Sequence, residues 1–178
     1  MTRELSDPHH ATAGWVGVPG DRTFYLQFED ASGAVTLLCE KGQVAGIAVL
    51  LAELLARVQD EPATDWDRTA MELRDPIEPL WRVGGIAVGV DPDRDRFLME
   101  LSELVPEGDE ADRAGEGGES AVVDEVHAWL NRDQTRRLAA HAAEVVGQGR
   151  PTCHLCARPR EPEGHVCPAT NGHGRLSR

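Results

Sequence analysis

Residues 35–55 read VTLLCEKGQVAGIAVLLAELL and place a strand pattern directly before a helix pattern. Val35–Cys39 is a short apolar run of the length that strands have. From Gln43 to about Gln59 the apolar side chains return every three or four positions, which is typical of a helix that buries one face. The stretch therefore predicts a strand followed by an amphipathic helix.

The same pattern returns 91 residues later, where residues 126–146 read VHAWLNRDQTRRLAAHAAEVV. We expect a strand over 122–130 and a helix over about 132–146, because Asn131 and Gln134 have the spacing of a capping box. A match at constant spacing indicates an internal duplication. The paired positions are Val35 with Val126, Gln43 with Gln134, Ile47 with Leu138, Glu53 with Glu144, and Leu54-Leu55 with Val145-Val146.

Two further strands are predicted before each of these units, so that three strands and a helix occur twice. This order predicts an α+β fold with an antiparallel sheet and both helices on one face. The additional strands are expected over 15–18, 23–29, 81–90 and 96–104. The predicted organisation is an α+β domain over 1–149, with pseudo-repeats at 14–59 and 81–148 and an acidic loop at 106–121, followed by a tail over 150–178.

The segment between the halves, residues 60–79, contains three prolines and several acids and reads as an irregular connector. Trp66 and Trp81 lie in it or directly after it. Aromatic side chains of this size contribute mostly by burial, so we expect both to pin the connector to the core.

The charge is −13 overall but uneven, since five arginines face two glutamates from Arg150 onward and leave +3 there and −16 on the rest. An acidic body argues against broad binding to nucleic acids or to anionic membranes. No apolar run approaches the roughly 20 residues that span a bilayer, and the start has no hydrophobic signal core. We therefore expect a cytoplasmic protein, in which the four cysteines are metal ligands or core thiols rather than disulfides.

The tail concentrates residue types that bind metals. Cys153 and Cys156 have the Cys-x2-Cys spacing with which two thiolates bind one cation from a tight turn. His165 and Cys167 follow two positions apart, and in an extended segment this spacing directs both side chains to the same side. Three sulfurs and one nitrogen complete a tetrahedral site without an open position, so we expect a structural Zn²⁺.

Alternatives remain for this site. His173 can replace His165 as the fourth ligand, whereas His154 would be strained between the two thiols. The cysteines can also be free or disulfide-bonded in an unfolded tail, but a segment this short and polar folds only if a metal supplies the free energy, on the order of 10 kcal/mol. Cys39 lies on a predicted strand and is expected in the core.

Two stretches resemble motifs of a known family. One is GVPGDRTFYLQ at 17–27, and the other begins with GRPTC at 149–153 and ends with GHVCPATNG at 164–172. Together they resemble an actinobacterial domain-of-unknown-function family over nearly the whole chain. Its members are encoded beside a lipid-kinase-like protein and a histidine-phosphatase-like protein, which implies work in a phosphate or modification pathway but no particular activity. The acidic loop is longer than this family's.

Other residues suggest weaker sites. Asp91, Asp93 and Asp95 alternate as in a calcium loop but lack its Gly and distal Glu, which favours a solvated turn. His127 and His141 are candidate acid–base groups without a nucleophile motif nearby. Arg22 and Arg94 end the matching hairpin segments 18–22 and 90–94, and could bind an anion together or form surface salt bridges with the many acids.

The leading functional prediction is a non-enzymatic adaptor whose zinc-stapled tail docks a protein partner, because the metal site is closed and no catalytic constellation lies beside it. The first alternative is an enzyme or ligand-binding protein that uses a cleft between the repeats, lined by Arg22, Arg94 and acids. The second is a nucleic-acid-binding zinc module, which the basic tail favours and the acidic body opposes.

Overall fold

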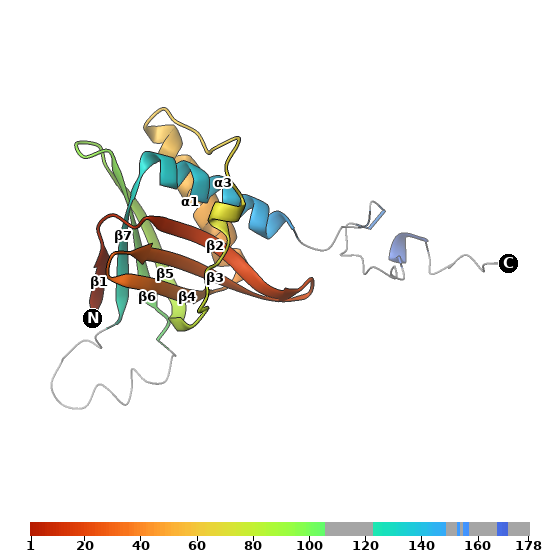
Figure 1. Cartoon of the computed structure of the whole chain (residues 1–178). Helices are drawn as coiled ribbons and strands as arrows, with labels where there is room; N and C mark the ends of the chain where they lie inside the picture. Colours follow the sequence, from red (N-terminus) through yellow and green to blue (C-terminus); the bar gives the residue numbers. More distant parts are fainter. Residues whose placement is uncertain (106–122, 149–152, 154, 157–166, 171–178) are drawn as a thin grey trace, which may run out of the picture.

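The structure is a computed structural model of the chain, and it describes residues 1–105, 123–148, 153, 155–156 and 167–170. Two helices and seven strands form the body, and two short 3₁₀ helices accompany them (Figure 1). In chain order the elements are β1 (Thr2–Leu5), β2 (His10–Val18), β3 (Asp21–Asp30), β4 (Gly33–Cys39), α1 (Lys41–Arg57), a 3₁₀ helix (Thr69–Met71), β5 (Pro79–Asp91), β6 (Arg96–Glu103), β7 (Glu125–Asn131), α3 (Arg132–Gly147) and a second 3₁₀ helix (Pro168–Thr170).

The strands form one mixed sheet in the order β1-β7-β6-β5-β4-β3-β2. Strands β2, β3 and β4 are antiparallel neighbours, and so are β5, β6 and β7. The expectation of a purely antiparallel sheet is wrong at two junctions, because β4 pairs with β5 and β1 pairs with β7 in parallel. The chain leaves β4 through α1 and a long connector, and such a helical crossover can return it in the same direction.

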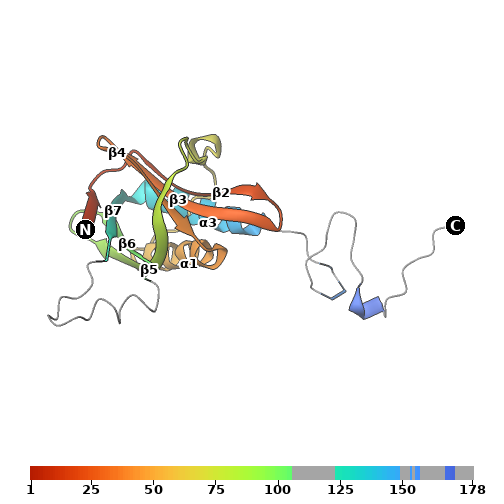
Figure 2. The same ribbon diagram turned by 90° about the horizontal axis from the view of Figure 1, so that it is seen from below.

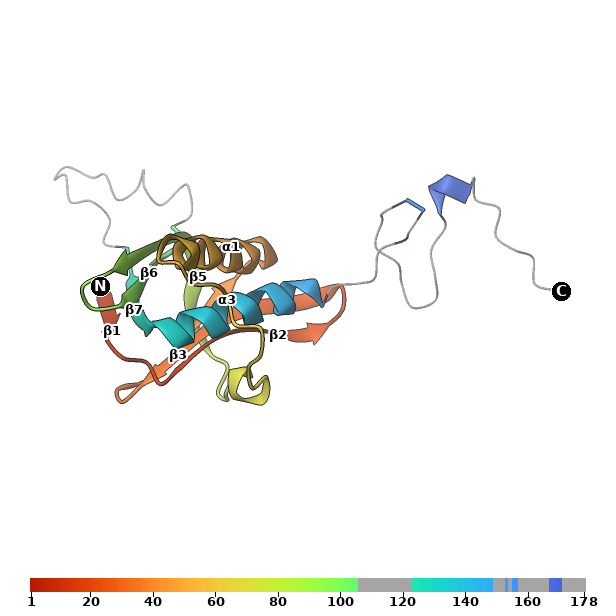
Figure 3. The same ribbon diagram turned by 90° about the horizontal axis from the view of Figure 1, so that it is seen from above.

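Both helices cover the same face of the sheet, as predicted. Seen from above they lie in front of the strands (Figure 3), and seen from below the strands lie in front of them (Figure 2). Alternate strand residues such as Leu26, Leu37, Met99 and Ala128 point into this layer and are fully buried. The helices contribute Val44, Ile47, Leu51, Leu55, Leu138, Ala142 and Val145 to the same continuous core.

The two halves exchange helix contacts, in that the helix of each half packs against a strand of the other. Helices α1 and α3 pack against one another, while α1 also contacts β5 of the second half and α3 contacts β2 of the first half. Each half therefore completes its hydrophobic layer with an element of the other.

Both helices begin with a capping box. The backbone amides of Glu40 and Asn131 each donate to the side-chain carbonyl of a glutamine at the third helical position, Gln43 and Gln134, over 2.8 Å. Each glutamine also reaches a segment outside its own half, since the Gln43 Nε2 donates to the Val83 carbonyl over 2.8 Å and the Gln134 Nε2 donates to the Pro8 carbonyl. Helix ends placed 91 positions apart in sequence are thus built alike.

The connector, residues 58–78, first runs beside α3, where the Ala63 amide donates to the Arg136 carbonyl over 3.0 Å, and then crosses the outer face of β2, β3 and β4. Gln27 holds it there, because its side-chain amide donates to the Arg74 carbonyl over 2.8 Å and accepts from the Arg74 backbone amide over 2.7 Å. Thr12 donates to the Met71 carbonyl, and Leu73 lies so close to Gly14 that an added Cβ would be 2.6 Å from its Cγ. We call this connector-covered outer surface of β2–β4 the covered face.

As predicted, the connector is irregular and Trp66 and Trp81 are partly buried against the core. The predicted acidic loop at 106–121 lies outside the described residues.

Candidate metal centre

Three cysteines of the tail lie together. The Sγ atoms of Cys153, Cys156 and Cys167 are all within 4.8 Å of one another, and those of Cys153 and Cys167 are 3.8 Å apart. A disulfide requires about 2.05 Å between sulfurs. Two thiolates that bind one tetrahedral Zn²⁺ with bonds of about 2.3 Å lie about 3.8 Å apart. The cluster thus has the dimensions of three corners of a metal site.

The backbone around the cluster favours thiolates. The pKa of Cys153 is lowered, chiefly by a hydrogen bond from the backbone amide of Leu155 and also by one from the amide of Cys156. Amides of a turn that point at a sulfur in this way are typical of Cys-x2-Cys metal sites. Cys153 and Cys167 are buried and Cys156 is half-buried, so the sulfurs face inward rather than toward water.

The structure brings together the three tail cysteines of the predicted site. His165, its alternative His173, and His154 lie outside the described residues. Cys39 lies apart in β4, where it is 4% exposed and burial raises the pKa of its thiol to about 12. Such a protonated core thiol is no metal ligand, in agreement with its predicted role.

The helix that leads to the cluster is anchored at its C-terminal end. Arg22 donates from Nη1 to the Gln148 carbonyl over 2.6 Å, and its guanidinium stacks 3.7 Å from the centre of the Trp15 ring. Trp15 Nε1 donates to the Gln148 side chain over 3.2 Å. A cation at the last carbonyls of a helix also opposes the helix dipole. Arg22, within the segment 17–27, thereby fixes the point where the chain enters the tail.

The structure also explains why position 17 of the segment 17–27 is a glycine. Its φ of +112° is favourable only for glycine, and an added Cβ would lie 2.2 Å from the Asp21 carbonyl oxygen across the β2–β3 hairpin.

A cavity of about 430 Å³ lies between β2, the connector and α3, and thus between the two halves. His141 stands at its wall, where its Nδ1 accepts from Trp66 Nε1 over 3.4 Å and its ring also hydrogen-bonds the backbone of Ala13. Burial lowers the pKa of His141. Arg68 and Glu144 close the rim with two hydrogen bonds of 3.0 Å. The imidazole is held neutral between fixed partners, which suits a structural role better than proton transfer.

The two predicted anion-binding arginines are not equivalent. Arg22 lies in β3, where it pairs with Gly17, whereas Arg94 lies in the β5–β6 hairpin and forms an ion pair of 3.7 Å with Asp91. Segments 18–22 and 90–94 also differ in structure, because the second hairpin has a longer turn, which closes at Asp91 and Arg96.

The alternating aspartates also serve that turn. The Asp91 carboxylate accepts from the backbone amides of Asp93 and Arg94 at 3.1 and 3.2 Å, and Asp95 pairs with Arg132. This is the solvated turn expected from the missing calcium-loop residues.

His127 has neighbours that the sequence did not reveal. It projects from the outer side of β7 between Glu100 of β6 and Glu125 of its own strand, with N–O distances of 3.9 and 3.5 Å. The register that brings Glu100 opposite His127 joins strands far apart in sequence. The available sequence signal for this cluster is that Glu100 and His127 occupy outward positions of neighbouring predicted strands.

A search of curated proteins and one of solved structures found no match to the chain. Among the described residues, no helix combines the length and apolar composition that crossing a bilayer requires. One family model matches residues 3–167, a span that runs from β1 to the last of the three clustered cysteines. The chain therefore belongs to the family described as protein of unknown function (DUF3090).

Proposed function

We propose that the chain binds one structural Zn²⁺ through Cys153, Cys156, Cys167 and an imidazole, and that the stapled tail docks a protein partner. The observation that carries the proposal is the convergence of three sulfurs within 4.8 Å. Soft thiolates favour zinc over magnesium or calcium, and a fourth ligand from His165, or from His173 in its place, closes the coordination shell. A closed shell suits a structural metal rather than a catalytic one.

The side chain between the first two cysteines supports docking. Leu155 is 54% exposed although it adjoins buried sulfurs. A rigid turn that presents an apolar side chain loses little entropy on binding a partner. The cluster lies outside the hydrophobic core of the body, so the tail can act as a separate module.

Metal content tests the zinc site. Elemental analysis of the purified protein should give close to one zinc per chain, and Cys153→Ser, Cys156→Ser or Cys167→Ser should lose most of it. Of His165→Ala and His173→Ala, only the variant that removes the true fourth ligand should lose zinc. Cys39→Ala is the matched control and should retain the metal. A metal-free wild-type protein would refute the proposed site.

Docking is tested separately. Partners cross-linked to the wild-type protein should be lost from a chain that ends at Gln148, and from Leu155→Asp, which we expect to keep its zinc. Partners that remain bound to the truncated chain contradict docking through the tail.

The cavity between the halves supports a second candidate function, the binding of a small ligand. Trp15 lines the cavity of about 430 Å³, a size within the usual range of ligand pockets. A metabolite screen by thermal shift should then reveal a ligand whose effect disappears in Trp15→Ala, which removes the ring that lines the cavity. A screen without such a ligand argues against this function.

We also infer that the halves arose by duplication. The like-built helix ends at Gln43 and Gln134 support this, as does the shared order of three antiparallel strands and a helix. Aligning the two halves within other members of the family tests it, because a glutamine should recur at both third helical positions.

A further inference from the structure

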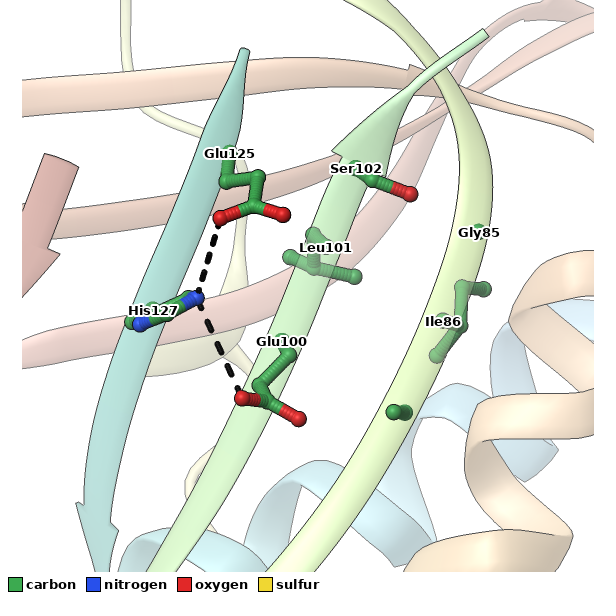
Figure 4. A pocket seen from close by; sticks show the side chains of 8 residues that line it. Gly85, Ile86, Glu100, Leu101, Ser102, Glu125 and His127 are labelled. Atoms are coloured by element: carbon green, nitrogen blue, oxygen red, sulfur yellow. Dashed lines mark ion pairs between the residues drawn. The ribbon is translucent and has the colours of Figure 1, made fainter. Parts of the chain in front are cut away.

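The outer surface of β5, β6 and β7, opposite the helices, carries an acidic pocket of about 310 Å³ (Figure 4). We call this surface the open face. Gly85 and Ala87 of β5 leave room beside the longer side chains of Glu100, Ser102, Glu125 and His127. Glu100 and Glu125 both approach the His127 Nε2, from β6 and from β7 (Figure 4). The pocket thus presents two carboxylates at the His127 Nε2, and a third, that of Glu4 of β1, lies 4.0 Å from the His127 Nδ1.

These side chains are accessible to a partner. The side chains of Glu100 and Glu125 are 48% and 42% exposed, and that of His127 is 25% exposed. Beside them Leu98 and Trp129 are paired across β6 and β7 and are only half-buried. The open face therefore offers negative charge next to apolar surface.

The covered face shows what can lie on such a surface. There Gln27 stands in register between Thr12 and Thr36, as Glu100 stands between Ala87 and His127 on the open face. The connector reduces the exposure of Gln27 to 1%. Its Arg74 forms an ion pair of 2.6 Å with Glu29 of β3. An extended segment with an arginine thus already covers one of the two faces.

We infer that the open face binds an extended, arginine-bearing segment of a protein partner, laid across β5–β7 as the connector is laid across β2–β4. A guanidinium can donate to two carboxylates at once, which matches Glu100 and Glu125 on either side of His127. The neighbouring Leu98 and Trp129 supply apolar contact for the rest of the segment. This surface is distinct from the tail and does not depend on its zinc.

A metal ion is a poorer occupant. Among the described residues, only the cysteine cluster brings three His, Cys, Asp or Glu ligand atoms within 4.8 Å of one another. A guanidinium carries several N–H donors on a planar group and can bridge carboxylates that do not converge on one point.

The probe is an acetylated TRTRTR hexapeptide, titrated into the full-length, ¹⁵N-labelled protein at low salt. We expect saturable binding below roughly 1 mM, with amide shifts concentrated at Gly85, Ser102 and their neighbours. Glu100→Gln and Glu125→Gln keep the side-chain shape and should each weaken binding about tenfold, as expected for the loss of a charged hydrogen bond. Glu53→Gln, on the exposed side of α1, is the matched control and should change affinity less than about twofold.

Four results would overturn the inference. The first is no saturable binding in this range, and the second is equal binding of a peptide with citrulline in place of arginine. The third is equal binding of free arginine amide, which would make the occupant a small cation. The fourth is a tenfold or greater gain in affinity when the five arginines from Arg150 onward are changed to glutamine, which would make the chain's own tail the occupant.

Discussion

Buried histidines make the stability of this fold depend on pH. His10 begins β2 and is 4% exposed, under the connector. Its pKa is lowered from 6.5 to about 4, chiefly by burial and also by the nearby Arg74, against the opposing effect of Glu29. The imidazole is thus neutral in the folded protein at a pH where the unfolded chain binds a proton.

Stability should therefore fall as the pH decreases from about 6.5 to about 4. In this window the unfolded state binds a proton at His10 that the folded state excludes, so each pH unit removes up to about 1.4 kcal/mol. His141, whose pKa is also lowered by burial, adds to the effect. Urea unfolding at pH 7 and pH 5 measures it.

The control for this effect is His10→Gln, which keeps a polar side chain but does not titrate. It should make stability less dependent on pH over the same range. An unchanged slope in this variant would show that His10 does not cause the acid sensitivity.

At the scale of the elements, the N-terminal ends of α1 and α3 are built alike and can be compared by matching substitutions. Gln43→Ala and Gln134→Ala each remove a capping bond and a bond to a backbone carbonyl outside the same half. We expect both to lower the free energy of unfolding by similar amounts, about 1–2 kcal/mol each. Chemical denaturation measures this, with Glu53→Gln as an exposed helix control that should stay within about 0.5 kcal/mol. A large effect at only one position would mean that the helix ends are not equivalent.

The sequence predicted the long, periodic elements well. Helices α1 and α3, the strands from β3 onward and the second capping box lie close to their expected positions, because each buries a regular apolar face. Strand β1 was missed, since Leu5 is its only fully buried residue. Strand β2 begins at His10 rather than at Trp15 because the small residues at 11–14 carry no alternation signal. Tertiary packing explains the smallest of them, Gly14, because Leu73 fills the space beside it.

The cysteine cluster and the open face also differ in how far the sequence predicts them. The cysteines could be predicted because their spacing within one short segment encodes the geometry of the cluster. The open face could not, because Glu100 and His127 meet only through the pairing of β6 with β7. A site assembled by strand register leaves no local motif.

At the scale of the whole molecule, we expect the body to fold without the proposed metal. Its continuous core is formed by the sheet and the helices, without the three clustered cysteines. Removing the proposed zinc with a strong chelator should therefore lower the melting temperature of the body by no more than about 2–4 °C, the shift that corresponds to about 1 kcal/mol. The same treatment should accelerate cleavage by trypsin within residues 150–178, because we propose that the metal supplies the folding free energy of the tail.

Differential scanning calorimetry and timed proteolysis measure the two effects. Collapse of the main transition on chelation would show that the cluster is part of the body rather than a separate module.

The exchange of helix contacts between the halves has a consequence for synthesis. The inner side of β2, including Ala13, is covered by α3, which the ribosome makes more than a hundred residues later. The first three-stranded unit consequently leaves the ribosome with part of its apolar surface uncovered and has to wait for the end of α3. A nascent chain halted in the middle would be a client for chaperones, not a smaller working protein.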